Sequence, residues 1–97
     1  MSQASINEKF SPRQACLDLA SEDEANLAFL DGHDDAILGV VEHNGFCAVV
    51  YDVKKIVRKL RRRDGMSNDE ALEFFAYNIA GAHLGEGTPL FLMPINK

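Results

Sequence analysis

Few residues in this 97-residue chain have the type and spacing that catalysis or metal binding requires. The run His33-Asp34-Asp35, with Glu42 or His43 after it, contains metal-ligand side chains. A metal site, however, needs three or four such side chains to converge. Nothing in this spacing produces that convergence, and the run is typical of a solvated turn that enters a strand. We therefore expect no metal ion and no cofactor.

The other reactive side chains also favour structural roles. Cys16 and Cys47 do not form a CxxC pair, so we expect free thiols in a reducing cytosol. His83 stands alone near the end of a predicted helix. The glycine-rich run at 85–88 follows a helix and precedes a strand, the reverse of the order in a phosphate-binding loop. We expect no catalytic residues, and the chain is predicted not to be an enzyme.

The charge of the chain is unevenly distributed. Its net charge of −5 disfavours general binding to nucleic acid or to anionic membranes. Seven of its ten Lys and Arg residues nevertheless lie in the segment 54–63. They are Lys54, Lys55, Arg58, Lys59, Arg61, Arg62 and Arg63. This basic helix could bind an acidic protein or a phosphate backbone, or it could pair with acids of the N-terminal segment or face water.

Acidic residues form the second candidate surface. The six that could share one face are Glu22, Asp23, Glu24, Asp31, Asp34 and Asp35. A negative face can occupy the basic nucleic-acid groove of another protein by imitating the charge pattern of phosphates. It can equally serve only to keep the protein in solution. The sequence does not decide which of the two surfaces is functional.

The basic residues belong to the first of two predicted helices, 53–64 and 68–84. The apolar positions of this first helix follow the helical repeat and are Val53, Ile56, Val57 and Leu60. Gly65 ends it, and the pair Ser67 and Glu70 forms a capping box that opens the second helix. The two helices resemble a helix-turn-helix. The second helix begins with three acids, however, and this disfavours reading of the DNA major groove.

A small antiparallel sheet is expected beside these helices. The dipeptide Asn44-Gly45 is a strong turn signal and predicts a β-hairpin over 36–51. A C-terminal strand is predicted over 88–93. The fold class is therefore α+β, with the two helices covering one face of the sheet.

The N-terminal third is predicted to be helical and added to this core. Residues 1–10 are polar and expected to be flexible. The pair Ser11-Pro12 starts a helical extension, 11–30, which is either one bent helix or two short ones. Residues 31–93 form the core of a single domain, 1–97. No apolar run is long enough to cross a bilayer, and we expect a cytoplasmic protein with no membrane partner.

Three stretches resemble a family of small uncharacterised proteins from bacteriophages, prophages and bacterial genomes. They read FLDGHDDAILGV at 29–40, DGMSNDEALEFFAYNIAGA at 64–82 and GEGTPLF at 85–91. The resemblance covers about two thirds of the chain and implies a phage-related context without an established activity. Two features depart from the family: the N-terminal segment, and a first helix that is strongly basic where the family has a mixed or acidic one.

These observations favour a non-enzymatic phage or prophage accessory protein that acts by protein–protein interaction in the bacterial host cell. The expected partner is a host protein or protein complex, which the chain would inhibit, such as an antiviral system of the CRISPR type or a nucleic-acid-handling complex. The alternative is a nucleic-acid-binding regulator that uses the helix 54–63. A homodimer is a further alternative because the chain has more aromatic residues than a small core needs. They are Phe74, Phe75, Tyr77 and Phe91.

Overall fold

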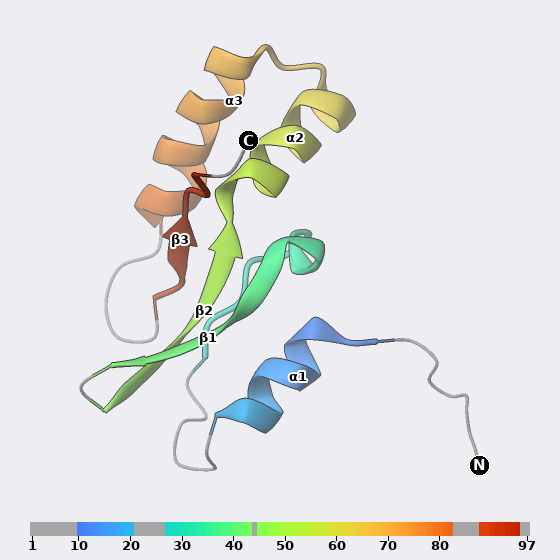
Figure 1. The fold of residues 1–97 in the computed structure, drawn as a ribbon. Coiled ribbons are helices and arrows are strands. Elements are labelled where there is room, and N and C mark those ends of the chain that lie inside the picture. Colours follow the sequence, from blue (N-terminus) through green and yellow to red (C-terminus); the bar gives the residue numbers. More distant parts are fainter. Residues whose placement is uncertain (1–9, 21–26, 44, 83–87, 96–97) are drawn as a thin grey trace.

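The computed structural model describes residues 10–20, 27–43, 45–82 and 88–95 (Figure 1). The helices are α1 (Pro12–Leu19), α2 (Val53–Asp64) and α3 (Asn68–Phe74). The strands are β1 (Ile37–His43), β2 (Phe46–Asp52) and β3 (Leu90–Leu92). One turn of 3-10 helix, Asp34–Ala36, precedes β1. These elements confirm the predicted α+β fold class.

The helix α2 begins and ends where its sequence predicts. The carboxylate of Asp52 accepts a hydrogen bond from the backbone N–H of Lys54 at 2.9 Å and so caps the first turn. Gly65 ends the helix with φ of 69°, a left-handed conformation that glycine adopts without strain. The helix therefore leaves β2 without a loop, and its orientation is fixed by the last residues of that strand (Figure 1).

The helix α3 starts as predicted but changes form. Ser67 and Glu70 make both hydrogen bonds of the capping box, at 3.1 and 2.8 Å. Regular α-helix ends at Phe74, and the chain continues as a π-helical stretch, Phe75–Ile79, and a 3-10 turn, Ala80–Ala82. The predicted helix 68–84 is therefore an α-helix over its first half only, and its last two residues lie outside the described ranges.

The sheet is mixed, and the prediction of an antiparallel sheet is wrong for its third strand. The hairpin β1–β2 is antiparallel as expected, with His43 opposite Phe46 and Gly45 at φ of 82° in the turn. Strand β3 pairs with β2 in parallel, Tyr51 opposite Phe91. The cause is the connection: α2 carries the chain away from the end of β2 and α3 brings it back. A crossover of this kind makes the next strand run parallel.

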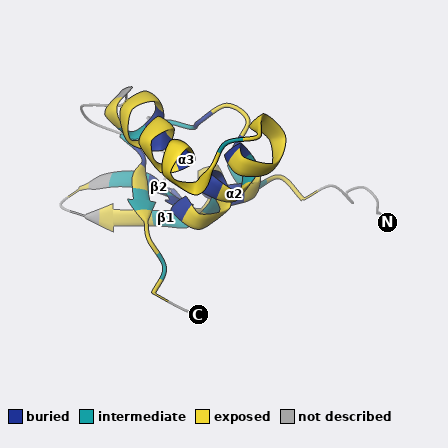
Figure 2. Cartoon of the chain, turned by 90° about the horizontal axis from the view of Figure 1, so that it is seen from above, coloured by how far each residue is buried: buried dark blue, intermediate teal, exposed yellow. Residues whose placement is uncertain are grey.

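The core lies between the sheet and the pair α2–α3. Val49 and Tyr51 of β2 are fully buried, and in Figure 2 the buried residues of α2 and α3 are on the sides that face the strands. Phe91 of β3 packs edge-on against Phe75 with ring centroids 5.0 Å apart, and tilted against Tyr51 at 6.2 Å. The opposite face of the sheet is aliphatic and partly exposed. Its exposed residues are Leu38, Val41, Leu90 and Leu92.

The N-terminal segment is part of this core, although the sequence predicts an added helical extension. Cys16 of α1 and Leu30 are buried among the core residues, and α1 packs against β1. Among the described residues of the predicted extension 11–30, helix is observed over α1. Residues 27–30 are not helical, because the phenol oxygen of Tyr51 accepts the N–H of Leu30 at 2.8 Å and Arg13 binds the Leu30 carbonyl. Residues 1–9, which are predicted to be flexible, and residues 21–26 of the predicted extension lie outside the described residues.

The hydrogen bond between Tyr51 and Leu30 gives a direct test of this docking. Replacing Tyr51 by Phe leaves the buried N–H of Leu30 without its acceptor, which should lower the free energy of unfolding by about 1–3 kcal/mol. Urea denaturation followed by circular dichroism measures the change. Tyr77→Phe, at a side chain that is 75% exposed, is the matched control and should have no measurable effect. Equal stability of the two variants would contradict the docking.

Candidate partner-binding surface on α2

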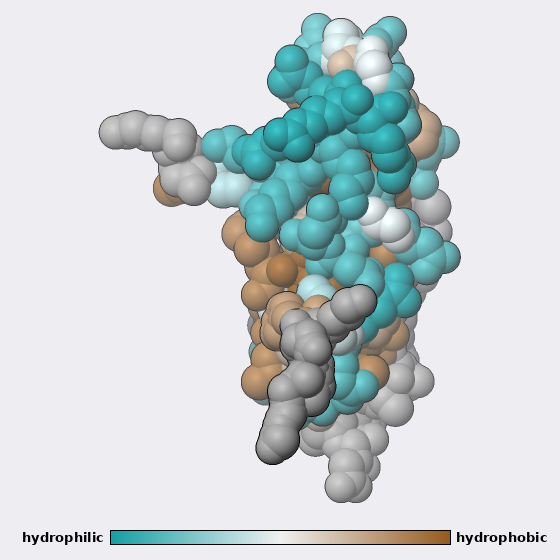
Figure 3. Space-filling model, turned by 90° about the vertical axis from the view of Figure 1, so that its right-hand side faces the viewer, coloured by the Kyte–Doolittle hydropathy of each residue, from teal (hydrophilic) through white to brown (hydrophobic). Residues whose placement is uncertain are grey.

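The cations of α2 are exposed because its apolar residues are buried. The apolar side chains of Val53, Ile56, Val57 and Leu60 are at most 7% exposed and face the core. Since these residues occupy one side of the helix, the Lys and Arg residues must lie on the other. Six of the seven are exposed, and Lys59 is half-buried. Figure 3 shows the resulting hydrophilic surface over the upper part of the molecule, where α2 lies.

Only part of this basic surface is neutralised within the described ranges. The ammonium of Lys59 lies 2.7 Å from a carboxylate oxygen of Asp35 and donates to the carbonyl of Gly32 as well. Arg63 contacts its neighbour Asp64 at 3.4 Å. The ion pairs among the described residues do not include Lys55, Arg58, Arg61 or Arg62. These four cations are therefore exposed and have no ion pair among the described residues.

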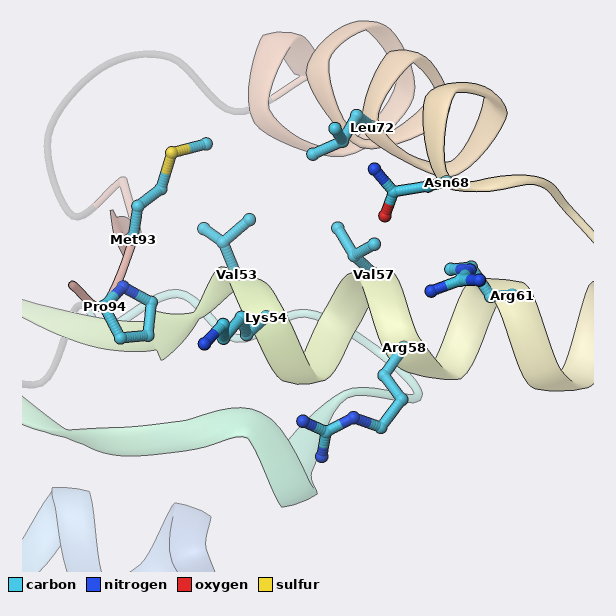
Figure 4. Close-up of a pocket in the computed structure, with 9 residues that line it drawn as sticks. All are labelled: Val53, Lys54, Val57, Arg58, Arg61, Asn68, Leu72, Met93 and Pro94. Atoms are coloured by element: carbon cyan, nitrogen blue, oxygen red, sulfur yellow. The ribbon is translucent and has the colours of Figure 1, made fainter. Parts of the chain in front are cut away.

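Two hollows flank α2. The first, of about 430 Å³, is almost entirely cationic. It is lined by Asp35, Lys55, Arg58, Lys59, Arg62 and Arg63. The second, of about 320 Å³, is a groove between α2, the start of α3 and the segment that follows β3 (Figure 4). It combines apolar and cationic side chains. Arg58 borders both hollows.

Three of the six residues of the predicted acidic face are described, and all three form ion pairs with basic residues of the chain. The Nε–H of Arg13 is shared between the two carboxylate oxygens of Asp34, at 2.8 and 3.0 Å, and a carboxylate oxygen of Asp31 lies 3.3 Å from Nη2 of the same guanidinium. Asp35 pairs with Lys59, and this hydrogen bond holds the pKa of the carboxyl below its usual value. These acids therefore connect α1 and α2 to the turn at 31–36 through ion pairs. Glu22, Asp23 and Glu24 lie outside the described residues, as does any pairing that they make with α2.

His33 is buried, contrary to the solvated turn that its sequence predicts. Its side chain is 7% exposed, and its Nδ1 has no hydrogen-bond partner among the described residues. Burial lowers the pKa of His33, and the nearby charges of Lys59 and Arg63 lower it further. The imidazole is therefore neutral at neutral pH. The apolar residues Phe29 and Leu30, four and three residues before His33, are a signal in the sequence for this burial.

The described residues contain neither a disulfide nor a cluster of metal-ligand side chains. Cys16 and Cys47 do not form a disulfide, as predicted, and burial raises the pKa of the Cys16 thiol. Across the described ranges no three His, Cys, Asp or Glu side chains are grouped so that they could hold a metal ion. None of the helices in these ranges has the length and apolar character needed to cross a membrane.

The buried His33 predicts a loss of stability in mild acid. Its pKa in the folded state is below the value of about 6.5 in an unfolded chain, so the unfolded state takes up the proton first as the pH falls. The free energy of unfolding should therefore decrease from pH 7.5 to pH 5. In the variant His33→Gln the free energy of unfolding should decrease less over this pH range, because the part due to His33 is removed and the parts due to the other titratable groups remain. Urea denaturation of both proteins at several pH values measures it, and parallel pH profiles would contradict the burial of His33.

Comparison with known proteins adds no relative: no family model matches the chain, and neither a curated protein nor a solved structure shows significant similarity to it.

Proposed function

We propose that this protein binds a macromolecule through the cations of α2, without an enzyme activity, and that its partner is an acidic surface of another protein. The observation that carries this proposal is the set of four exposed cations, Lys55, Arg58, Arg61 and Arg62, which have no ion pair among the described residues. A single capped helix holds them on one side, so they are presented together. Such a cluster favours an anionic partner and speeds association with it.

The charges next to the cluster favour a protein over nucleic acid. The first turn of α3 carries Asp69 and Glu70, and both are exposed. The net charge of the chain is −5. An extended phosphate backbone that passed along α2 would meet these acids as well as the cations. The acidic patch of a folded protein can be small enough to contact the cations alone.

The kind of partner is proposed from the resemblance to small phage and prophage proteins. In that context the partner is a host protein or protein complex in the bacterial cytoplasm, and binding inhibits it. An antiviral complex of the CRISPR type or a nucleic-acid-handling complex is the class we favour. Inhibition needs only that α2 covers a surface that the complex uses.

A nucleic acid bound by the helix 54–63 is the second candidate. The observation that favours it is the almost wholly cationic hollow beside Lys55, Lys59 and Arg62, which could accept a phosphate group. Binding of this kind would contact phosphates without reading bases, and its affinity would fall steeply with salt.

A homodimer is a further alternative, and it would use other surfaces of the chain than the cations of α2. Of the four aromatic residues that suggested it, Phe75 and Phe91 pack against each other in the core. Phe74 and Tyr77 are exposed, at 37% and 75%. The partly exposed aliphatic face of the sheet could also contact a second copy. Sedimentation equilibrium distinguishes a dimer from a monomer directly.

A charge-reversal variant tests the proposed function. Arg58→Glu combined with Arg62→Glu should leave the fold intact, because both side chains are exposed. The tagged wild-type chain should retain one stoichiometric protein from a bacterial lysate, and the double variant should bind that protein at least about tenfold more weakly, or about 1.4 kcal/mol. Asp69→Lys combined with Glu73→Lys is the control and should not weaken capture.

Two results would contradict the proposal. Capture that is equal for the wild type and the charge-reversal variant would remove α2 as the binding surface. Binding of labelled duplex DNA or of single-stranded RNA at low salt, lost in the same variant and weakened by added salt, would replace the protein partner by the second candidate.

A further inference from the structure

The groove beside α2 has an apolar floor that the basic surface alone does not explain. In Figure 4 Val53 and Val57 point from α2 toward Leu72 of α3, and Met93 borders the same space from the segment after β3. Val53 and Val57 are nearly buried, whereas Leu72 is 36% exposed and Met93 is 61% exposed. The part of the floor that is open to solvent is therefore formed by Leu72 and Met93.

The rim of the same groove is cationic. Lys54, Arg58 and Arg61 border it along α2, and the amide of Asn68 lies across from Arg61 (Figure 4). None of the described residues that line the groove is acidic. From 53 to 61 the lining follows α2 over about 12 Å, at 1.5 Å per residue, or roughly two turns. The groove thus combines an apolar floor with cations spaced along one side.

We infer that this groove binds an acidic amphipathic helix of the partner protein. Aliphatic side chains of that helix enter the space above Val53, Val57 and Leu72, and its carboxylates contact Arg58 and Arg61. This is the groove mode of helix recognition, in which anchors one turn apart give affinity and flanking charges give orientation. The volume of about 320 Å³ is near the lower limit for binding pockets and fits a small number of aliphatic anchors. The inference rests on the proposed function and names the chemistry of the bound segment.

The apolar floor argues against two other anionic ligands, a phosphate backbone and an acidic segment that lacks apolar side chains. A phosphate backbone gains nothing from burying aliphatic surface, and it would leave Leu72 and Met93 exposed. An acidic segment without apolar side chains would do the same. Only a segment that carries both kinds of side chain removes the floor from water and neutralises the rim at the same time.

The experiment uses a synthetic peptide as the probe. The peptide has about 15 residues, with Leu at i, i+3, i+4 and i+7 and Glu at most other positions, and it carries a fluorescent label. Fluorescence anisotropy measures its Kd for the full chain at moderate salt. A second peptide with Ala in place of each Leu has the same charge and no anchors, and should bind at least about tenfold more weakly.

Two matched pairs of variants locate the binding on the chain. Arg61 lines the groove and Arg62 does not, although the two are adjacent, exposed and equally charged. Arg61→Glu should raise the Kd at least about tenfold, and Arg62→Glu should raise it only by a small factor through long-range charge. Leu72→Gln removes apolar floor without a change in charge, and should also weaken binding. Leu90→Gln, at a side chain that is 46% exposed on the sheet, is its control.

Each remaining outcome overturns the inference. Equal effects of Arg61→Glu and Arg62→Glu, or no effect of Leu72→Gln, would mean that the peptide is held by charge alone. A wild-type chain that does not bind the peptide would also exclude the groove. In these cases the proposed function still depends on the separate capture experiment with Arg58 and Arg62. A wild-type dimer that Arg61→Glu or Leu72→Gln dissociates would assign the groove to a second copy of the chain.

Discussion

The burial of one side of α2 is the constraint on which both the core and the candidate surface depend. Ile56 and Leu60 are at most 2% exposed and lie at the centre of the apolar cluster. The helix follows β2 directly, and Asp52, the last residue of that strand, caps its first turn. A rotation of the helix about its axis would therefore break this cap and the pairing at the end of β2. A rotation would also move a Lys or Arg into the core, and an unpaired buried charge is strongly unfavourable. The position of the cations is therefore a consequence of the packing that stabilises the fold.

Tyr51 connects this centre to the rest of the chain. Its ring contacts Phe91 of β3, and its phenol oxygen accepts the N–H of Leu30, so one fully buried side chain joins β2, β3 and the N-terminal segment. The ion pairs of Arg13 with Asp34 and of Lys59 with Asp35 lie at the surface around this junction. Exposed pairs of this kind contribute at most about 1 kcal/mol each, so they orient the turn at 31–36 more than they stabilise it. Two residues of the predicted acidic face, Asp34 and Asp35, take part in these contacts.

The parts of the fold that could be predicted are those whose signals are local. The bounds of α2 follow from Asp52, the apolar repeat and Gly65, all within a few turns of one another. The parallel pairing of β3 could not be predicted, because it depends on where two helices return the chain. Phe75 is buried with Ala71 and Ile79, which are spaced four residues apart, whereas its neighbour Phe74 is exposed. Which of the two adjacent phenylalanines faces the core is set by the packing of this segment in the folded chain. The cations of the candidate site were likewise predictable, but its apolar floor was not, since Leu72 and Met93 meet Val53 only in the folded chain.

The separation of charge has a consequence for how a partner can approach. An acidic partner is attracted to the exposed cations of α2 and repelled by a chain whose net charge is −5. Both forces act over about a Debye length, roughly 8 Å at physiological salt, so they orient the partner before contact. The acids of the first turn of α3 stand just beyond Asn68, at one end of the groove, and this end repels a negative segment. The arrangement favours a bound segment whose carboxylates lie along Arg58 and Arg61, on the α2 side of the groove, and point away from the first turn of α3. Charge therefore sets the direction of binding, and the apolar floor supplies the surface that is buried once the segment is in place.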